Sequence, residues 1–347
     1  MKSIRFAIFT SITVLLAAVL AKNSFAQQHK QNPEPIKIRW ILAHEPIGLF
    51  QRAAKRFSAE LESRAPGQVV IELLTLREYA DKYNKGVLPD QGEVVNLMKN
   101  GNVEMSQLYT TTLGRWDNDL YALDLPFLFR DHEHAQKVLD GKIGKSLLAG
   151  LADGGAVRGL AFTYSGGYRV IPALTAIHKI EDFKGMKIRT SSSPVAEDTF
   201  LLLGAKPVVM DLEAIGSSMK QGLIQAAEST YPRFYSMRQN EFSKVLNDTK
   251  HSLFLTSIVV SDSFWKGLSP DLQSAIANAA QIAGRIERDE AIQDAEVTKA
   301  KCAQDGVQVV TLSPAEEAKF KSVTSSLYKK YKSYFTKGLV ESIQQTR

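Results

Sequence analysis

Two arginines stand at the ends of predicted strands, where their side chains could bind an anion. Arg189 lies in a short strand-like run at residues 186–190, and Arg169 follows the pair Gly166 and Gly167 at the end of another run. In open α/β sheets, ligands bind outside the carboxyl ends of the strands. A guanidinium there offers a planar fork of N–H donors that fits a carboxylate. Each arginine therefore predicts carboxylate binding, and a surface ion pair is the alternative for each.

Aromatic and hydroxyl side chains occur near the same predicted strand ends. Such side chains could supply the apolar wall and the hydrogen bonds of a small-molecule pocket. For any one of them, packing in the core or between lobes is the alternative. The candidates are Tyr109, Thr110, Thr111, Trp116, Tyr164, Tyr168, Tyr231 and Phe234.

The catalytic and metal-binding motifs are incomplete. Residues 144–146 (GKS) end like a phosphate-binding loop, but position 139 is Leu139 where that loop requires a glycine. Residues 217–220 (SSMK) match the Ser-x-x-Lys pattern without companion motifs. His132 and His134 are two positions apart, so they do not share a helix face, and we expect both at the surface. The sequence therefore predicts no catalytic residue, no metal ligand and no cofactor, hence a protein that is not an enzyme.

Alternating strands and helices predict an α/β fold. Residues 36–42 and 69–74 flank an amphipathic helix at 50–61, which is the βαβ unit of a parallel sheet. Residues 97–103 resemble 218–224, since each stretch has a helix end, a glycine and a strand start. This echo favours two similar lobes with a ligand cleft between them. Further strands are expected at 103–109, 157–164, 186–190, 207–210, 223–227 and 250–260, and further helices at 94–98, 131–151, 194–203 and 212–221.

Two C-terminal helices have clear start signals. Ser269 precedes a proline at the first position of a helix that could run to about residue 303. Ser313 and Glu316 have the spacing of a capping box at the start of the next helix. Cys302, the only cysteine, lies near the end of the first of these helices and is expected to be an incidental thiol.

The N-terminus predicts export. Residues 1–26 have the basic start, the apolar run and the Ser-Phe-Ala ending of a signal peptide, with an uncleaved membrane anchor as the alternative. Residues 27–35 are expected to be a mobile lead-in. Of the 43 Lys and Arg residues in the 347-residue chain, three lie in the signal, so 40 face 37 acidic residues and the net charge falls from +6 to +3. That small, dispersed charge argues against nucleic-acid binding.

Several motifs together resemble the extracytoplasmic solute receptors of TRAP transporters, of the dicarboxylate-receptor type, over roughly residues 36–310. Departures from the family pattern are Ser229 in place of the usual Asn, Gln225 in place of Asp, and an unusual stretch around residues 81–90. The stretches that carry the resemblance are 125–131 (LPFLFRD), 182–189 (DFKGMKIR), 203–207 (LGAKP), 221–228 (QGLIQAAE) and 249–251 (TKH).

The resemblance implies the fold of the periplasmic binding proteins: two α/β lobes joined by crossing strands and a long helix. Lobe I is expected at 36–165 plus about 252–290, and lobe II at 166–251 plus about 291–347. The main carboxylate-binding arginine of the family falls on Arg189 and a second ligand-facing arginine on Arg169. Tyr109, Thr110 and His44 would contribute from lobe I, and Ser229 from the position of the family Asn.

The implied function is capture of a small organic carboxylate in the periplasm by closure of the cleft. Delivery to TRAP membrane subunits would follow, powered by an ion gradient and without an ATP-binding subunit. Three alternatives are a sensory receptor that presents its ligand to a membrane kinase, an exported enzyme on a binding-protein scaffold, and a receptor for an uncharged ligand. The residues leave open whether the ligand is a sugar acid, a keto acid or an aromatic acid.

Overall fold

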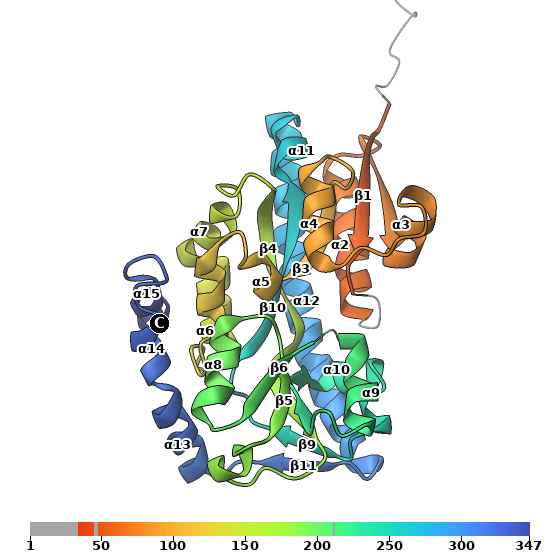
Figure 1. Ribbon diagram of the computed structural model, residues 1–347. Helices are drawn as coiled ribbons and strands as arrows, with labels where there is room; N and C mark the ends of the chain where they lie inside the picture. Colours follow the sequence, from red (N-terminus) through yellow and green to blue (C-terminus); the bar gives the residue numbers. More distant parts are fainter. Residues whose placement is uncertain (1–33, 45–47, 211) are drawn as a thin grey trace, which may run out of the picture. The chain divides into compact units, whose positions relative to one another are not determined.

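The computed structural model describes residues 34–44, 48–210 and 212–347. The predicted signal peptide at 1–26 and most of the predicted lead-in at 27–35 lie outside these residues. Lys37–Arg347 forms one compact unit of strands and helices (Figure 1). Within the described ranges, no helix combines the length and the apolar character that a membrane crossing requires.

The predicted strand–helix–strand unit is confirmed at the start of the chain. β1 (Ile36–Leu42) and β2 (Val69–Thr75) are neighbours in the sheet, and α2 (Gly48–Arg64) connects them. α2 buries one stripe of side chains because its apolar residues recur three and four positions apart. β1 runs parallel to β3 (Met105–Tyr109), so the carboxyl ends of both strands meet at one edge of the sheet. α3 (Leu76–Tyr83), α4 (Gln91–Lys99), α5 (Thr110–Leu113) and η1 (Asn118–Asp124) complete this part of the chain.

β4 (Val157–Ala173) is longer than the sequence predicted, because the expected end of the strand at Gly166 and Gly167 is wrong. Both glycines have positive φ, 96° and 86°, a conformation that L-residues with side chains rarely adopt. Opposite them, the pairing with β10 (Leu253–Ser261) shifts register between Phe254 and Leu255. The glycines therefore form a bulge that redirects the strand instead of ending it. The first part of β4 pairs with β10, and the second part pairs with β7, β8 and β9.

The second group of strands surrounds the far part of β4. β5 runs parallel to both β6 and β7, and β9 runs parallel to β11. The predicted strand at 223–227 is reduced to the two residues of β7, because the N–H groups of Leu223 and Ile224 bond back to Ser218 O around Gly222. The elements of this group are β5 (Lys187–Thr190), α8 (Pro194–Leu202), β6 (Lys206–Val209), η3 (Leu212–Ala214), α9 (Ile215–Lys220), β7 (Ala226–Ala227), β8 (Ser229–Thr230), α10 (Tyr231–Ser236), η4 (Gln239–Glu241), β9 (Val245–Asp248) and β11 (Gln308–Thr311).

The helix predicted at 131–151 is two helices, α6 (His132–Asp140) and α7 (Lys142–Gly150). Gly141 separates them in an extended conformation, and a Cβ atom at this position would lie 2.4 Å from Lys137 O. His134 is buried, with its Nε2 2.8 Å from Ile343 O. The expectation that His134 is a surface residue is therefore wrong.

The long helix α12 (Pro270–Gln304) is confirmed and packs against α2, β4 and α10, so it follows both groups of strands (Figure 1). The Ser269 hydroxyl caps it by accepting from Leu272 N at 3.3 Å. α13 (Pro314–Thr324) has the predicted Ser313 cap. The Glu316 carboxylate, however, accepts from Ile180 N at 2.8 Å, so it links α13 to η2 (Ile180–Phe183) in place of the reciprocal bond expected of a capping box.

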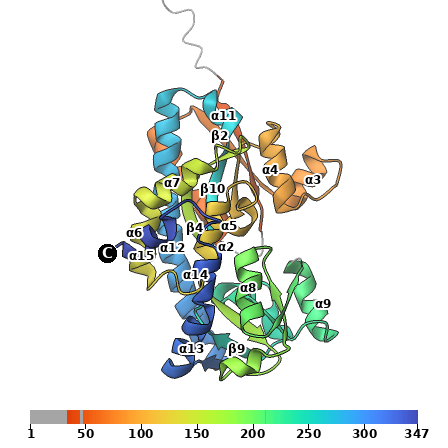
Figure 2. The same cartoon turned by 60° about the vertical axis from the view of Figure 1, so that its left-hand side comes forward.

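Among the described residues, the hydrophobic core consists of one large cluster and three smaller ones. The large cluster joins α2, β1, β3, β10 and the first part of β4, and the smaller clusters surround β5, β9 and α9. The chain returns to the large cluster at its C-terminal end, where α14 (Ser326–Lys330) and α15 (Leu339–Gln345) contribute Leu327 and Ile343 and α15 packs against α7 (Figure 2). Cys302 is buried in one of the smaller clusters. This arrangement agrees with the predicted two α/β lobes joined by crossing strands and a long helix.

Candidate functional site

Arg189 is buried at the carboxyl end of β5. The strand holds it between β6 and β7, where it pairs with Val208 and Ala227. Its Nε donates to Met210 O at 3.1 Å, while its buried Nη1 has no hydrogen-bond partner among the described residues. Burial, followed by the like charge of Arg233, lowers the pKa of Arg189 to about 10. Arg189 therefore stays cationic at neutral pH, with one donor group still able to bind a ligand.

Arg169 lies just beyond the β4 bulge and is 1% exposed. Two carboxylates face it, with Asp124 Oδ1 3.6 Å from Nη2 and Glu228 Oε1 3.7 Å from Nε. Its guanidinium carbon lies 3.8 Å from the centre of the Phe254 ring. Neither Nη1 nor Nη2 has a hydrogen-bond partner among the described residues. Arg169 is thus held electrostatically and by the ring, while its terminal donors remain able to bind.

A buried chain of hydrogen bonds fixes Glu228 beside Arg169. His251 Nε2 lies 3.1 Å from Glu228 Oε1, and His251 Nδ1 lies 2.8 Å from the Thr249 hydroxyl. Ser191 N donates to Glu228 Oε2 at 3.3 Å. Burial alone would raise the pKa of Glu228, but the charge of Arg169 and the bond from His251 outweigh it, and the pKa falls to about 2. Glu228 is therefore a permanent anion that holds Arg169 in place.

Asp124, at the end of η1, is the second anion beside Arg169 and was not singled out from the sequence. Burial raises its pKa to about 6, against the opposing effect of Arg169. Its Oδ2 is buried without a hydrogen-bond partner in the part of the chain that the structure describes. Asp124 is consequently mostly ionised at neutral pH but takes up a proton in mildly acidic solution.

Tyr109 and His44 approach the same arginines from the first group of strands. Tyr109, at the end of β3, stacks on Phe254 with ring centres 4.9 Å apart. His44 follows β1, and its ring centre lies 5.8 Å from that of Tyr109. Burial, then the charges of Arg233 and Arg189, hold the pKa of His44 well below its usual range, so the ring is neutral. Arg189, Arg169, Tyr109 and His44 are therefore assembled in one buried region.

The hydroxyl groups of Thr110 and Ser229 are used within the protein. The Thr110 hydroxyl donates to Leu255 O at 3.1 Å, which ties α5 to β10. The Ser229 hydroxyl donates to Gln239 Oε1 at 2.6 Å, and Ser229 is fully buried. The proposed ligand contacts of these two residues therefore have less geometric support than those of the arginines. Gln225, the other departure from the family pattern, accepts from Lys187 N at 2.7 Å at the start of β5.

Arg233, on α10, is a third buried arginine that the sequence reasoning missed. Its Nη1 donates to the Tyr109 hydroxyl at 3.1 Å and to the Ser165 hydroxyl at 3.3 Å. One sequence signal could have identified it. Arg233 is a single cation within the run Tyr231-Pro232-Arg233-Phe234-Tyr235, directly after Glu228-Ser229-Thr230. A cation surrounded by aromatic residues is expected to be buried with its charge directed at a partner.

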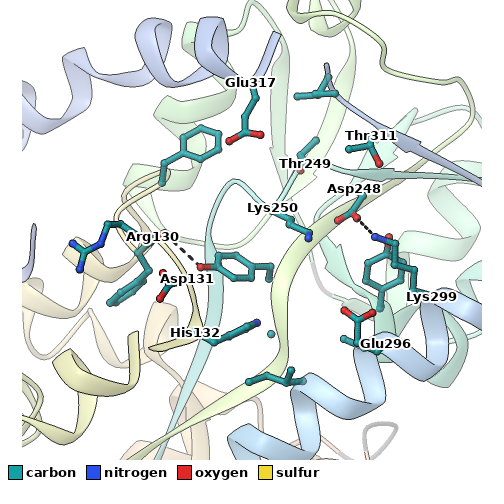
Figure 3. Close-up of a pocket in the computed structure, with 18 of the residues that line it drawn as sticks. Arg130, Asp131, His132, Asp248, Thr249, Lys250, Glu296, Lys299, Thr311 and Glu317 are labelled. Atoms are coloured by element: carbon teal, nitrogen blue, oxygen red, sulfur yellow. Dashed lines mark hydrogen bonds and ion pairs between the residues drawn. The ribbon is translucent and has the colours of Figure 1, made fainter. Parts of the chain in front are cut away.

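A separate pocket of about 730 Å³ lies beside the β4 bulge and α12, and neither Arg189, Arg169 nor Arg233 lines it. Figure 3 shows the Lys250 side chain reaching into this pocket, across from His132 and Glu296. On one side, Lys299 Nζ lies 2.8 Å from Asp248 Oδ2. Acidic and basic side chains both line this pocket. It therefore suits a carboxylate less well than the arginine cluster does.

Comparisons with known proteins show the family of the chain. Residues 45–334 match the family described as bacterial extracellular solute-binding protein, family 7. The chain is 29% identical over 259 residues to the 2,3-diketo-L-gulonate-binding periplasmic protein of Escherichia coli, covering 75% of this chain and 76% of that protein. It is 28% identical over 262 residues to the C4-dicarboxylate-binding periplasmic protein of Rhodobacter capsulatus, covering 74% and 75%.

A solved structure shows the same fold. The TRAP periplasmic solute-binding protein of a Bradyrhizobium species, in complex with D-galacturonate, is 28% identical, with a TM-score of 0.79 over 89% of this chain and 100% of that one. The chain belongs to family 7 of the bacterial extracellular solute-binding proteins, as a TRAP receptor of the dicarboxylate type.

Proposed function

We propose that this protein binds a small organic carboxylate in the periplasm and delivers it to the membrane subunits of a TRAP transporter. The observation that carries the proposal is the buried guanidinium of Arg189, whose Nη1 has no hydrogen-bond partner among the described residues. Burying an unmet donor of a charged group costs free energy, and a ligand carboxylate would remove that cost. The relatives named above support this choice, because diketogulonate, C4-dicarboxylates and galacturonate all carry a carboxylate.

The proposed binding step places one ligand carboxylate on Arg189, with Arg169 adding charge and hydrogen bonds. The Nε contact with Met210 O fixes the direction of Arg189 before the ligand arrives, so little side-chain entropy is lost on binding. Glu228 and Asp124 likewise fix the direction of Arg169 before the ligand arrives. Because these groups are shielded from water, a charge-assisted hydrogen bond there is stronger than one at the surface.

The proposed closure brings the two lobes together around the ligand. We assign β1, α2, β3 and β10 to lobe I, and β5, β6, β9 and α10 to lobe II. The bulge at Gly166 and Gly167 is the proposed hinge in β4, since it lies where the pairing of that strand changes. The lobe I core also receives α14 and α15, so we place the C-terminal segment after α13 with lobe I. Closure occurs when the ligand binds the closed state better than the open one.

The test is a binding series with acids and matched uncharged analogues. Purified protein is titrated by calorimetry with succinate, D-galacturonate and D-glucuronate, and with the amide of each acid. The proposal predicts binding of at least one acid and at least tenfold weaker binding of its amide, about 1.4 kcal/mol. Arg189→Gln should weaken the binding of that acid by at least the same factor.

Arg238→Gln is the matched control, because Arg238 is an exposed arginine of the same lobe whose Nε donates to Glu241 at 2.6 Å. This variant should bind like the wild type. If Arg189→Gln and Arg238→Gln bound the acid equally well, Arg189 would have no part in recognition. If the wild type bound no acid, the proposed function would be wrong.

A further inference from the structure

The pocket of about 730 Å³ beside α12 is separate from the arginine cluster, although the same two segments of backbone contribute to both. Tyr168 lines the pocket, whereas its neighbour Arg169 faces Glu228. Lys250 lines the pocket, whereas the Nε2 of its neighbour His251 lies 3.1 Å from Glu228 Oε1. Because neighbouring side chains of a strand point to opposite faces, the pocket lies on the other side of β4 from Arg169.

Two residues that line the pocket have a strained backbone. Phe127 has φ 58° and Lys250 has φ 48°, in the left-handed region that residues with side chains rarely adopt. Phe127 N donates to His251 O at 2.7 Å, so a hydrogen bond joins the two strained segments. Strained residues cluster at ligand-binding sites, where the surrounding structure holds them. The strain therefore favours a binding role for this pocket.

Most charged side chains that line the pocket already have a partner. Some of them form ion pairs with each other, and the others bond to backbone groups outside the pocket. These side chains are therefore already engaged within the protein. The ion pairs are Lys299 with Asp248 at 2.8 Å and Lys321 with Glu317 at 2.5 Å, and the other two side chains are Arg130 and Asp131.

Lys250 and Glu296 carry opposite charges that are not paired. Among the residues that the structure describes, neither side chain has a hydrogen bond or an ion pair. Figure 3 shows Lys250 reaching into the pocket across from Glu296 and His132. Burial, followed by the charge of Lys250, lowers the pKa of His132, so this imidazole is neutral at pH 7 and adds no third charge. A ligand with one anionic and one cationic group would meet both free charges.

The rest of the pocket wall is largely apolar and aromatic. Tyr168 packs on His132 with ring centres 4.8 Å apart. Phe129, Tyr231 and Ile292 line the same space. A pocket of this volume, with apolar walls and a few polar groups, suits a small organic ligand. The ligand should therefore combine an apolar body with charges of both signs.

We propose that this pocket is a second ligand site, which binds a small zwitterion with an apolar body, such as an α-amino acid with an aromatic or aliphatic side chain. Lys250 binds the carboxylate, Glu296 binds the ammonium group, and the ring of Tyr168 contacts the apolar body. This proposal goes beyond the proposed function, because the arginine cluster does not line the pocket. Either site can be present without the other.

The test is a calorimetric titration with L-phenylalanine and L-leucine and with analogues that carry one charge each. Hydrocinnamate and 4-methylpentanoate lack the ammonium group, and phenethylamine and isopentylamine lack the carboxylate. The wild type should bind at least one of the two amino acids. The series is repeated in Arg189→Gln, because a carboxylate analogue could bind at Arg189. In that variant the amino acid should bind within about twofold of the wild type, and at least about tenfold more tightly than either of its analogues.

Three variants test the two unpaired charges. Lys250→Gln and Glu296→Gln should each weaken amino-acid binding at least about fivefold. Lys250→Gly also relieves the strained φ, so it should melt no lower than the wild type and still lose binding. Lys55→Gln is the matched control, because Lys55 is exposed on α2 and does not line the pocket, and it should bind like the wild type.

The outcomes separate this site from the arginine cluster. A wild type that binds neither amino acid would overturn the proposal, and so would wild-type affinity in both Lys250→Gln and Glu296→Gln. Loss of amino-acid binding in Arg189→Gln, with that variant folded by circular dichroism, would place the amino acid in the arginine cluster and also overturn the proposal. Amino-acid binding at this pocket by a protein that binds none of the acids tested above would overturn the proposed function alone.

Discussion

Replacing Glu228 by Gln should destabilise the protein in a pH-dependent way. The pKa of Glu228 is about 2 in the folded protein, against an ordinary value of 4.5, because Arg169 and His251 stabilise its anion. A shift of about 2.5 units corresponds to roughly 3 kcal/mol of unfolding free energy at neutral pH. Loss of the Glu228 charge also lowers the pKa of Asp124, which offsets part of the loss. We therefore expect Glu228→Gln to lose about 2 to 3 kcal/mol at pH 7.

The sign of the pH dependence follows from the direction of the shift. A carboxyl group whose pKa is depressed by folding contributes its stability above its unfolded pKa, 4.5, and loses it as the pH falls toward 2. The wild type should therefore lose stability over that window, and Glu228→Gln should lose less. Urea denaturation of ligand-free protein, followed by circular dichroism at pH 7 and pH 3.5, measures both quantities.

Glu181→Gln serves as the control for the Glu228 experiment. Glu181 pairs with Lys319 at the surface, with 56% of its side chain exposed, so its replacement should leave the denaturation midpoint nearly unchanged. If Glu228→Gln unfolded at the same urea concentration as the wild type at both pH values, the buried network around Arg169 would not contribute to stability. Glu228 would then not hold Arg169 in place through its charge.

Two further predictions concern the hinge strand and the buried acid beside it. Gly167→Ala should cost about 1 to 2 kcal/mol of folding free energy through its positive φ alone. Gly166→Ala should cost more, because its new Cβ would also lie 2.4 Å from the Thr230 hydroxyl oxygen. Thermal melts would show equal losses of stability in the two variants if only backbone strain mattered. Burial raises the pKa of Glu287 to about 8, although its Oε2 accepts a hydrogen bond from Tyr164 N at 2.7 Å. Glu287 therefore takes up a proton when the protein folds, and the stability of the wild type should fall as the pH rises from 4.5 to 8. Glu287→Gln should melt with a weaker pH dependence between pH 5.5 and 8.5, and an unchanged dependence would contradict the protonated assignment.

The sequence predicted the elements whose signals are local. Residues close together in the sequence encode both the apolar stripe of α2 and the Ser269-Pro start of α12. Both helices are present as predicted. The glycine pair in β4 was misread because a glycine with positive φ can end a strand or bulge it, and only the opposite strand decides which. The boundary of that strand therefore depends on β10, about 90 positions away.

Only part of the candidate site was predicted, because some of its residues have local sequence signals and others do not. Arg189 was found because it lies near the end of β5, and Arg169 because the glycine pair before it marks a break in the strand pattern, although β4 continues through that position. Arg233 was missed because its direction depends on Tyr109, 124 positions earlier in the chain. The hydroxyl of Ser229 was proposed for a ligand from its position alone, whereas its hydrogen bond to Gln239 depends on how the chain folds after α10. The hydrogen-bond partner of a buried polar group depends on the tertiary structure, which the hydrophobic periodicity of the sequence does not reveal.

The central claim concerns the contact between Arg189 and the ligand. A crystal structure of the protein with the ligand that co-purifies from its host, identified by mass spectrometry, tests it most directly. In that structure, we expect a carboxylate oxygen within hydrogen-bonding distance of Arg189 Nη1, with the ligand enclosed beside Tyr109 and Phe254. A ligand bound elsewhere, for example against Lys250 in the pocket beside α12, with Arg189 making no contact to it, would show that Arg189 is not the carboxylate-binding residue.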